Sequence, residues 1–123
     1  MTTYTAGIDK SEYGNGFKYN MIAEANLTIG DVVKQTANGI NYVAQTSANT
    51  DIAIGIAAQT TTSGSPVLIF GSGCKVQTTA SLTAGTVYAP AASGALGSKG
   101  GQADQNFALC VDGTASSSVI RIL

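Results

Sequence analysis

The sequence predicts a small all-β protein, built as a β-barrel or a sandwich from two repeated strand-turn units, with an extended N-terminal arm. Three observations lead to this prediction. Two distant segments share one motif, short apolar runs alternate with Gly, Asn and Ser turn signals, and no window has a capped helical period. The chain of 123 residues is long enough for one domain with a modest hydrophobic core.

The internal repeat keeps a single register over most of its length. The segment 27–33 (LTIGDVV) matches 82–88 (LTAGTVY) at an offset of 55 residues, since 82 minus 27 is 55. The further matches are 38–40 with 93–95 and 51–57 with 106–112 at this offset, and 67–70 with 119–122 at an offset three residues shorter. Because separate features share the register, duplication explains them better than chance.

Each unit reads as a glycine turn, a strand, a hairpin turn, a return strand, an apolar strand and a closing strand. The expected strands are 31–35, 40–44, 52–58 and 67–70 in the first unit, and 86–89, 95–99, 107–111 and 119–122 in the second. The segment 95–99 stays open between strand and loop, and 74–78 between the units reads as a strand with one polar face. The structural glycines, at turns and in the apolar strand, are Gly30, Gly39, Gly55, Gly85 and Gly94.

Residues 1–25 lie outside the repeat, so we divide the chain into an N-terminal arm, 1–25, and a duplicated β-domain, 26–123, with units at about 27–70 and 82–122. The arm begins rich in Thr and Gly and continues with an alternating Phe-x-Tyr-x-Met pattern. Two interpretations are open: an edge strand of the domain's own sheet, or an arm that pairs with a neighbouring molecule. The candidate anchors for binding a neighbouring molecule are Tyr4, Tyr13, Phe17, Tyr19 and Met21.

The composition argues against several classes of partner. Charged residues make up 11% of the chain, against roughly 25% in a typical soluble domain. The six basic residues are scattered and the net charge is −1, so we expect no nucleic-acid partner. Apolar runs such as 67–70 are too short to cross a bilayer, and the first residues do not have the pattern of a secretory signal. We therefore expect no membrane partner and synthesis in a cytoplasm.

The residue inventory also argues against an enzyme. The sequence has no His, which removes the usual nucleophile pairs, the commonest general base and the commonest transition-metal ligand. Its acidic residues are dispersed over turns and linkers, and no phosphate-binding or calcium-binding loop motif is present. Cys74 and Cys110 are expected to be buried and unbridged. We expect no catalytic residue, no cofactor and no metal.

The duplicated segments carry a resemblance to a known family. The segments are 27–33, 54–57, 82–88 and 119–122. They resemble tailed-phage capsid decoration (cement) proteins and the capsid-bound base of phage head fibres, over about residues 27–123. The resemblance implies a small β-barrel-like domain on the outer capsid surface of the virion, assembled in the host cytoplasm. Such proteins bind the major capsid protein, often as homotrimers, and stabilise the shell. The family has no catalytic residues, and Cys110 departs from its usual Gly.

Two alternative functions remain. One is another virion component, namely a head-fibre base or a tail or baseplate component. The other is a carbohydrate-binding or cell-surface-binding β-module, which predicts a cluster of exposed aromatic residues around an open groove. Aromatic residues at a subunit interface favour capsid decoration, whereas aromatic residues around an open groove favour sugar binding.

Overall fold

The computed structural model describes residues 3–4, 8–11, 16–39, 41–78, 81–100, 104–113 and 118–123. In this part of the chain, regular structure consists of twelve short strands and one 3-10 turn, which confirms the all-β prediction. The strands are β1 (Thr3–Tyr4), β2 (Ile8–Ser11), β3 (Lys18–Ala23), β4 (Val32–Gln35), β5 (Tyr42–Gln45), β6 (Ala53–Ala57), β7 (Pro66–Phe70), β8 (Lys75–Thr78), β9 (Val87–Pro90), β10 (Leu96–Ser98), β11 (Ala108–Gly113) and β12 (Ser118–Ile122). The 3-10 turn is η1 (Ala92–Gly94).

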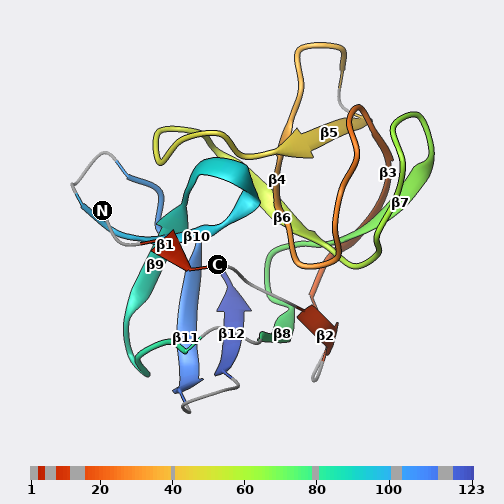
Figure 1. Cartoon of the computed structure of the whole chain (residues 1–123). Helices are drawn as coiled ribbons and strands as arrows, with labels where there is room; N and C mark the ends of the chain where they lie inside the picture. Colours follow the sequence, from red (N-terminus) through yellow and green to blue (C-terminus); the bar gives the residue numbers. More distant parts are fainter. Residues whose placement is uncertain are drawn as a thin grey trace.

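The strands form a closed barrel and a separate sheet, which lie side by side in Figure 1. The barrel has the order β3-β5-β4-β6-β7, and the seven-stranded sheet has the order β1-β10-β9-β11-β12-β8-β2. The first unit is thus a barrel, whereas the second is an open sheet. The uncertain segment 95–99 contains a strand, β10, which pairs with β9.

The same order of neighbours occurs in both bodies. In the barrel it runs β5-β4-β6-β7-β3, and in the sheet it runs β10-β9-β11-β12-β8. The strand β3 therefore corresponds in position to β8, although both lie outside the repeated segments of the sequence. The arm predicted for residues 1–25 does not extend to Lys18–Ala23, because these residues form a barrel strand.

The two bodies differ in how their outer strands are paired. In the barrel, β3 closes onto β5 through a short parallel contact at Ile22 and Ala23. In the sheet, β1 pairs with β10 and β2 pairs with β8, so that strands from the N-terminal segment occupy both edges. Tyr4 belongs to β1, and Tyr13 lies outside the described residues.

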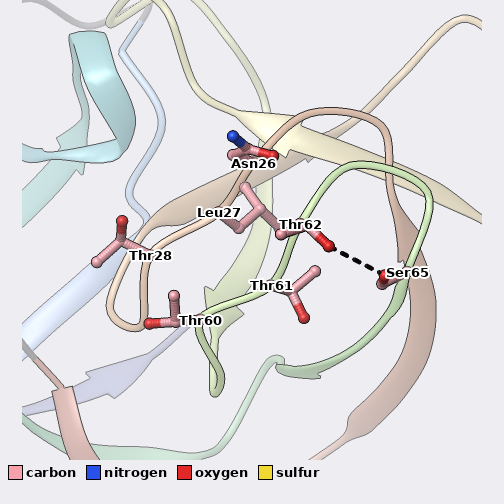
Figure 2. A pocket seen from close by; sticks show the side chains of 7 residues that line it. All are labelled: Asn26, Leu27, Thr28, Thr60, Thr61, Thr62 and Ser65. Atoms are coloured by element: carbon pink, nitrogen blue, oxygen red, sulfur yellow. Dashed lines mark hydrogen bonds between the residues drawn. The ribbon is translucent and has the colours of Figure 1, made fainter.

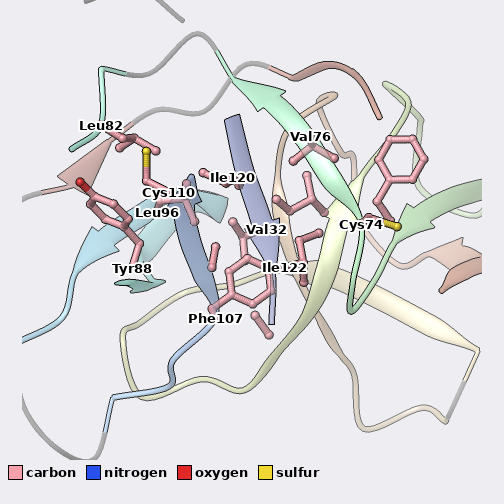
Figure 3. Packing of buried hydrophobic residues seen from close by; sticks show 14 residues of the cluster. Val32, Cys74, Val76, Leu82, Tyr88, Leu96, Phe107, Cys110, Ile120 and Ile122 are labelled. Carbon is pink, nitrogen blue, oxygen red and sulfur yellow. The ribbon is translucent and has the colours of Figure 1, made fainter. Parts of the chain in front are cut away.

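Two hydrophobic clusters hold the structure together. The cluster inside the barrel consists of Met21, Ala23, Leu27, Val33, Val43, Ala57, Val67 and Ile69. The other contains Val32 and Ile56 from barrel strands and Phe107 and Ile122 from the second unit, so it joins the two bodies. Figure 3 shows Val32 beside Phe107 and Ile122. Adjacent strand residues point to opposite faces, which is why Val33 faces the barrel interior while Val32 faces the sheet.

A barrel of five strands encloses little space, because the diameter of a barrel grows with its number of strands. Gly55 provides room where β6 lies against β7. A Cβ at this position would overlap the carbonyl oxygen of Phe70 and lie 2.6 Å from Cγ2 of Ile69. Gly55 is therefore needed for packing within β6, whereas the other structural glycines lie in turns.

The predicted glycine turns have the expected backbone. The positive φ angles are 96° at Gly30, 134° at Gly39, 82° at Gly85 and 68° at Gly94. Ser93 also has a positive φ, 59°, so two consecutive residues between β9 and β10 have positive φ. Hairpin turns of this kind match the twist of the strands that they connect.

Candidate interaction surface

Exposed apolar side chains are concentrated at few positions. The large hydrophobic residues that are exposed in the described part of the chain are Phe17, Tyr19, Ile52, Val111 and Leu123. Phe17 has 67% of its surface exposed and Tyr19 has 39%. Both were predicted as anchors; Phe17 directly precedes β3, and Tyr19 is the second residue of this strand.

The backbone that carries these two aromatic residues is held firmly. The N–H of Phe17 donates to the carbonyl of Ser72 (2.9 Å), and its carbonyl accepts from Gly71 (2.7 Å). A Cβ at Gly71 would overlap the Tyr19 ring, which therefore lies directly on this glycine. The side chains are thus presented from a fixed backbone, so their binding costs little conformational entropy in the main chain.

The beginning of β3 also has an open edge. Backbone groups of Phe17 and Ala23 face β7, and those of Ile22 and Glu24 face β5, with Ile22 donating to Asn41 (2.7 Å). The backbone N–H and C=O groups of Lys18 and Asn20 point to the same side of β3 as those of Ile22. The β3–β5 pairing, however, begins only at Ile22. Within the described residues, the backbone of Lys18 and Asn20 has no strand on that side. An open edge with exposed side chains accepts an added strand.

The C-terminal residue approaches the same region. The N–H of Gly73 donates to the carbonyl of Ile122 (2.7 Å), the residue before Leu123. Ile122 thus contacts the turn that also holds Phe17. We call Phe17, Tyr19, Leu123 and the open edge at Lys18 and Asn20 the junction patch. Lys18 gives the junction patch a positive charge. The ammonium nitrogen of Lys18 lies 5.8 Å from the centre of the Phe70 ring.

The prediction of Met21 as an anchor is wrong. Its exposed fraction is 8%, and its side chain packs inside the barrel. The register explains this position, because Met21 is opposite Val67 and antiparallel partners point to the same face. Leu123 and the open edge were not predicted from the sequence. A terminal Leu resembles any strand residue, and an edge depends on pairings between distant segments.

A shallow hollow of about 430 Å³ lies at the other loops of the barrel. Figure 2 shows its lining, which is Asn26, Leu27, Thr28, Thr60, Thr61, Thr62 and Ser65. Several polar groups are occupied by the protein itself: Thr60 accepts from Ile29, and the hydroxyls of Thr62 and Ser65 are 3.2 Å apart. No aromatic residue lines the hollow, so it lacks the platform that sugar binding would need.

Acidic residues serve to fix loops. Asp51 accepts from the backbone N–H of Ser47 (2.6 Å) and of Ala48 (3.1 Å), and it pairs with Lys34 (3.2 Å). The N–H of Ser47 is the main reason that the pKa of Asp51 lies below its ordinary value. The buried Asp31 accepts from the N–H of Thr28 and from the amide of Gln45. These carboxylates hold local structure.

Cysteine and metal chemistry give no further site in the described part of the chain. Cys74 and Cys110 are free and buried, as expected, and burial raises the pKa of the Cys110 thiol. Among the described residues, no group of three or more His, Cys, Asp or Glu side chains is arranged to hold a metal ion. None of the described helical segments has the length and apolar character needed to cross a membrane.

The sequence matches no family model, and a search of curated proteins gives no significant match. The junction patch is therefore the feature from which we argue function.

Proposed function

We propose that this protein is a structural virion component that binds the outer surface of a phage capsid and stabilises it by bridging major-capsid subunits. The observation that carries the proposal is the exposure of Phe17 and Tyr19 on a fixed strand with an open edge. Aromatic side chains of this kind are frequent among the residues that dominate binding energy at protein interfaces. The resemblance of the repeated segments to decoration proteins supplies the partner.

The low charge of the chain supports the same function. Because only 11% of the residues of the chain are charged, its surface has few ions to desolvate when it packs against another protein. Decoration also needs only modest affinity at each site, because a homotrimer binds through three equivalent surfaces and gains avidity. We therefore expect a trimer whose subunits each present a junction patch to the shell.

The test is binding to capsids assembled without this protein, followed by cryo-electron microscopy. Regular density at threefold or quasi-threefold positions is the expected result, with light scattering giving the mass of a trimer for the free protein. A bare shell at saturating protein would contradict the proposal and favour a head-fibre base, a tail or baseplate component, or a glycan-binding module. A glycan array would then distinguish the last of these.

Variants link the binding to the patch. Phe17→Ser and Tyr19→Ser should each weaken capsid binding about tenfold or more, since truncating a dominant interface residue costs over about 1.4 kcal/mol. Val111→Ser is the matched control, because Val111 is exposed to a similar degree as Tyr19 but lies on β11. Equal losses in all three variants would show that the patch is not the binding surface.

A further inference from the structure

The hairpin turn between β4 and β5 contains an Asn-Gly pair in an exposed position. Asn38 is exposed, and Gly39 has a φ of 134°. The N–H of Gly39 donates to the carbonyl of Thr36 at 3.4 Å, beyond the usual range for such a bond. The nearest atom to an added Cβ at Gly39 is in the Tyr42 ring at 3.9 Å, so the backbone around this glycine is open.

We propose that Asn38 is a site of spontaneous deamidation in the folded protein. The backbone nitrogen of Gly39 loses its proton and attacks Cγ of Asn38, and the bond from Cγ to the side-chain nitrogen breaks. Ammonia leaves and a five-membered succinimide remains. Water then opens the ring at either carbonyl, giving aspartate or isoaspartate. The net change is water consumed and ammonia released, without oxidation or reduction.

The position of Asn38 gives this reaction a structural consequence. Its side-chain amide donates to the carboxylate of Glu24, which directly follows β3. The N–H of Glu24 donates to Val43 (2.9 Å), so Glu24 lies on the β3–β5 pairing that closes the barrel. Deamidation replaces the donor by a second carboxylate. The two negative charges repel each other across the closing contact of the barrel.

A second site of related chemistry provides one internal comparison. Asp112-Gly113 is chemically related, but Gly113 pairs with Ser118 in the sheet. A Cβ at Gly113 would overlap the carbonyl oxygen of Leu82 and lie 2.9 Å from the nitrogen of Ala84. This backbone is held in the sheet and closely covered, so it cannot make the rotation that ring closure needs. We expect succinimide formation at Asn38 and not at Asp112.

The first test is peptide mapping by mass spectrometry after incubation of the native protein at mildly alkaline pH. The peptide with Asn38 should gain the mass difference between OH and NH2 and separate into aspartate and isoaspartate forms. Asn38→Gln should stop the conversion, because its longer side chain does not form the five-membered ring. An unchanged Asn38, over a time that fully converts a synthetic peptide of residues 34–43, would overturn the proposal.

The second test measures the consequence at the β3–β5 contact that closes the barrel, by thermal unfolding. Asn38→Asp should lower the Tm by several degrees, and Glu24→Gln should remove most of that effect, because the repelling partner is then neutral. This is a double-mutant cycle between two contacting residues. If Asn38→Asp lowered the Tm equally in the natural protein and in the Glu24→Gln variant, the proposed repulsion between positions 24 and 38 would be overturned. Neither test depends on capsid binding.

Discussion

The side chain of Gln105 binds both backbone polar groups of Ala53. The N–H of Ala53 donates to Oε1 of Gln105 (2.6 Å), and Nε2 of Gln105 donates to the carbonyl of Ala53 (2.9 Å). The amide thus takes the place of a neighbouring strand at the start of β6. The preceding residue, Asp104, accepts from the amide of Asn49 (2.9 Å), so two consecutive side chains of the second unit hold the first.

Replacing Gln105 by Ala should therefore weaken the connection between the two units. We expect the free energy of unfolding to fall by about 1–3 kcal/mol, since two bonds are lost and backbone groups of Ala53 are left without a partner. Urea denaturation followed by circular dichroism measures the change. Gln35→Ala is the control, because Gln35 is exposed on β4. Equal effects of the two substitutions would contradict the role of Gln105.

The strands and turns of the repeat could be predicted from local sequence because they depend on local chemistry. The apolar runs at β6 and β11 and the turn glycines Gly30 and Gly94 need only neighbouring residues to be recognised. The barrel could not be chosen over a sandwich in this way. Its closure depends on the parallel contact between β3 and β5, whose residues are about twenty positions apart and carry no shared motif.

The candidate site was predicted only in part for a similar reason. The alternation Phe-x-Tyr-x-Met identifies one face of β3, but it does not show which part of that face lies inside the barrel. Tyr19 is opposite Ile69 and Met21 is opposite Val67, so the two side chains share one face of β3, but only Met21 is buried in the barrel. Register and strand ends decide this difference, and neither can be read from a single sequence.

Met21 and Phe17 should respond in opposite ways to truncation. Met21→Ala removes a buried side chain from the barrel core, so we expect a loss of about 2–5 kcal/mol in the free energy of unfolding. Phe17→Ala removes an exposed ring and should change stability by about 0.5 kcal/mol or less. Denaturant titration of both variants checks this. A large loss with Phe17→Ala would assign that ring to folding instead of binding.

The Gly55→Ala substitution should destabilise the barrel although it adds only one methyl group. The new Cβ would overlap the backbone of β7 at Phe70, which cannot move without breaking the β6–β7 pairing. Overpacking of this kind costs about 1–3 kcal/mol or more. Gly100→Ala is the control, since its Cβ would meet Asp104 at an ordinary 3.6 Å. A Gly55 variant as stable as the control would contradict the tight interior.

Both thiols should be unreactive in the folded protein. Cys74 and Cys110 are buried, and burial raises the pKa of Cys110, which lowers its thiolate fraction at neutral pH. We expect slow modification by a thiol reagent in buffer and rapid modification of two thiols per chain in denaturant. The rate of thiol modification is measured as the rate of colour release from a chromogenic disulfide reagent. Fast labelling without denaturant would show that the core between barrel and sheet opens readily.

Asp51 should make the protein sensitive to acid. Its pKa in the folded state is below its ordinary value of 3.8, chiefly because the N–H of Ser47 donates to the carboxylate, with further donors in the Ser47 hydroxyl and Lys34. A depressed pKa means that the folded state binds its proton less readily than the unfolded state. The stabilisation is therefore complete above the ordinary pKa and is lost as the pH falls through the lower, folded value.

The measurement is the free energy of unfolding as a function of pH below about 5, a range in which aspartates titrate. Asp51→Asn should be less stable than the natural protein at neutral pH, and the two should converge in acid, where the carboxylate of the natural protein is protonated. Ser47→Ala removes the hydroxyl donor but keeps the stronger N–H donor, so it should reduce the difference only in part. A constant gap between the natural protein and Asp51→Asn down to the lowest pH would show that the Asp51 charge does not stabilise this loop.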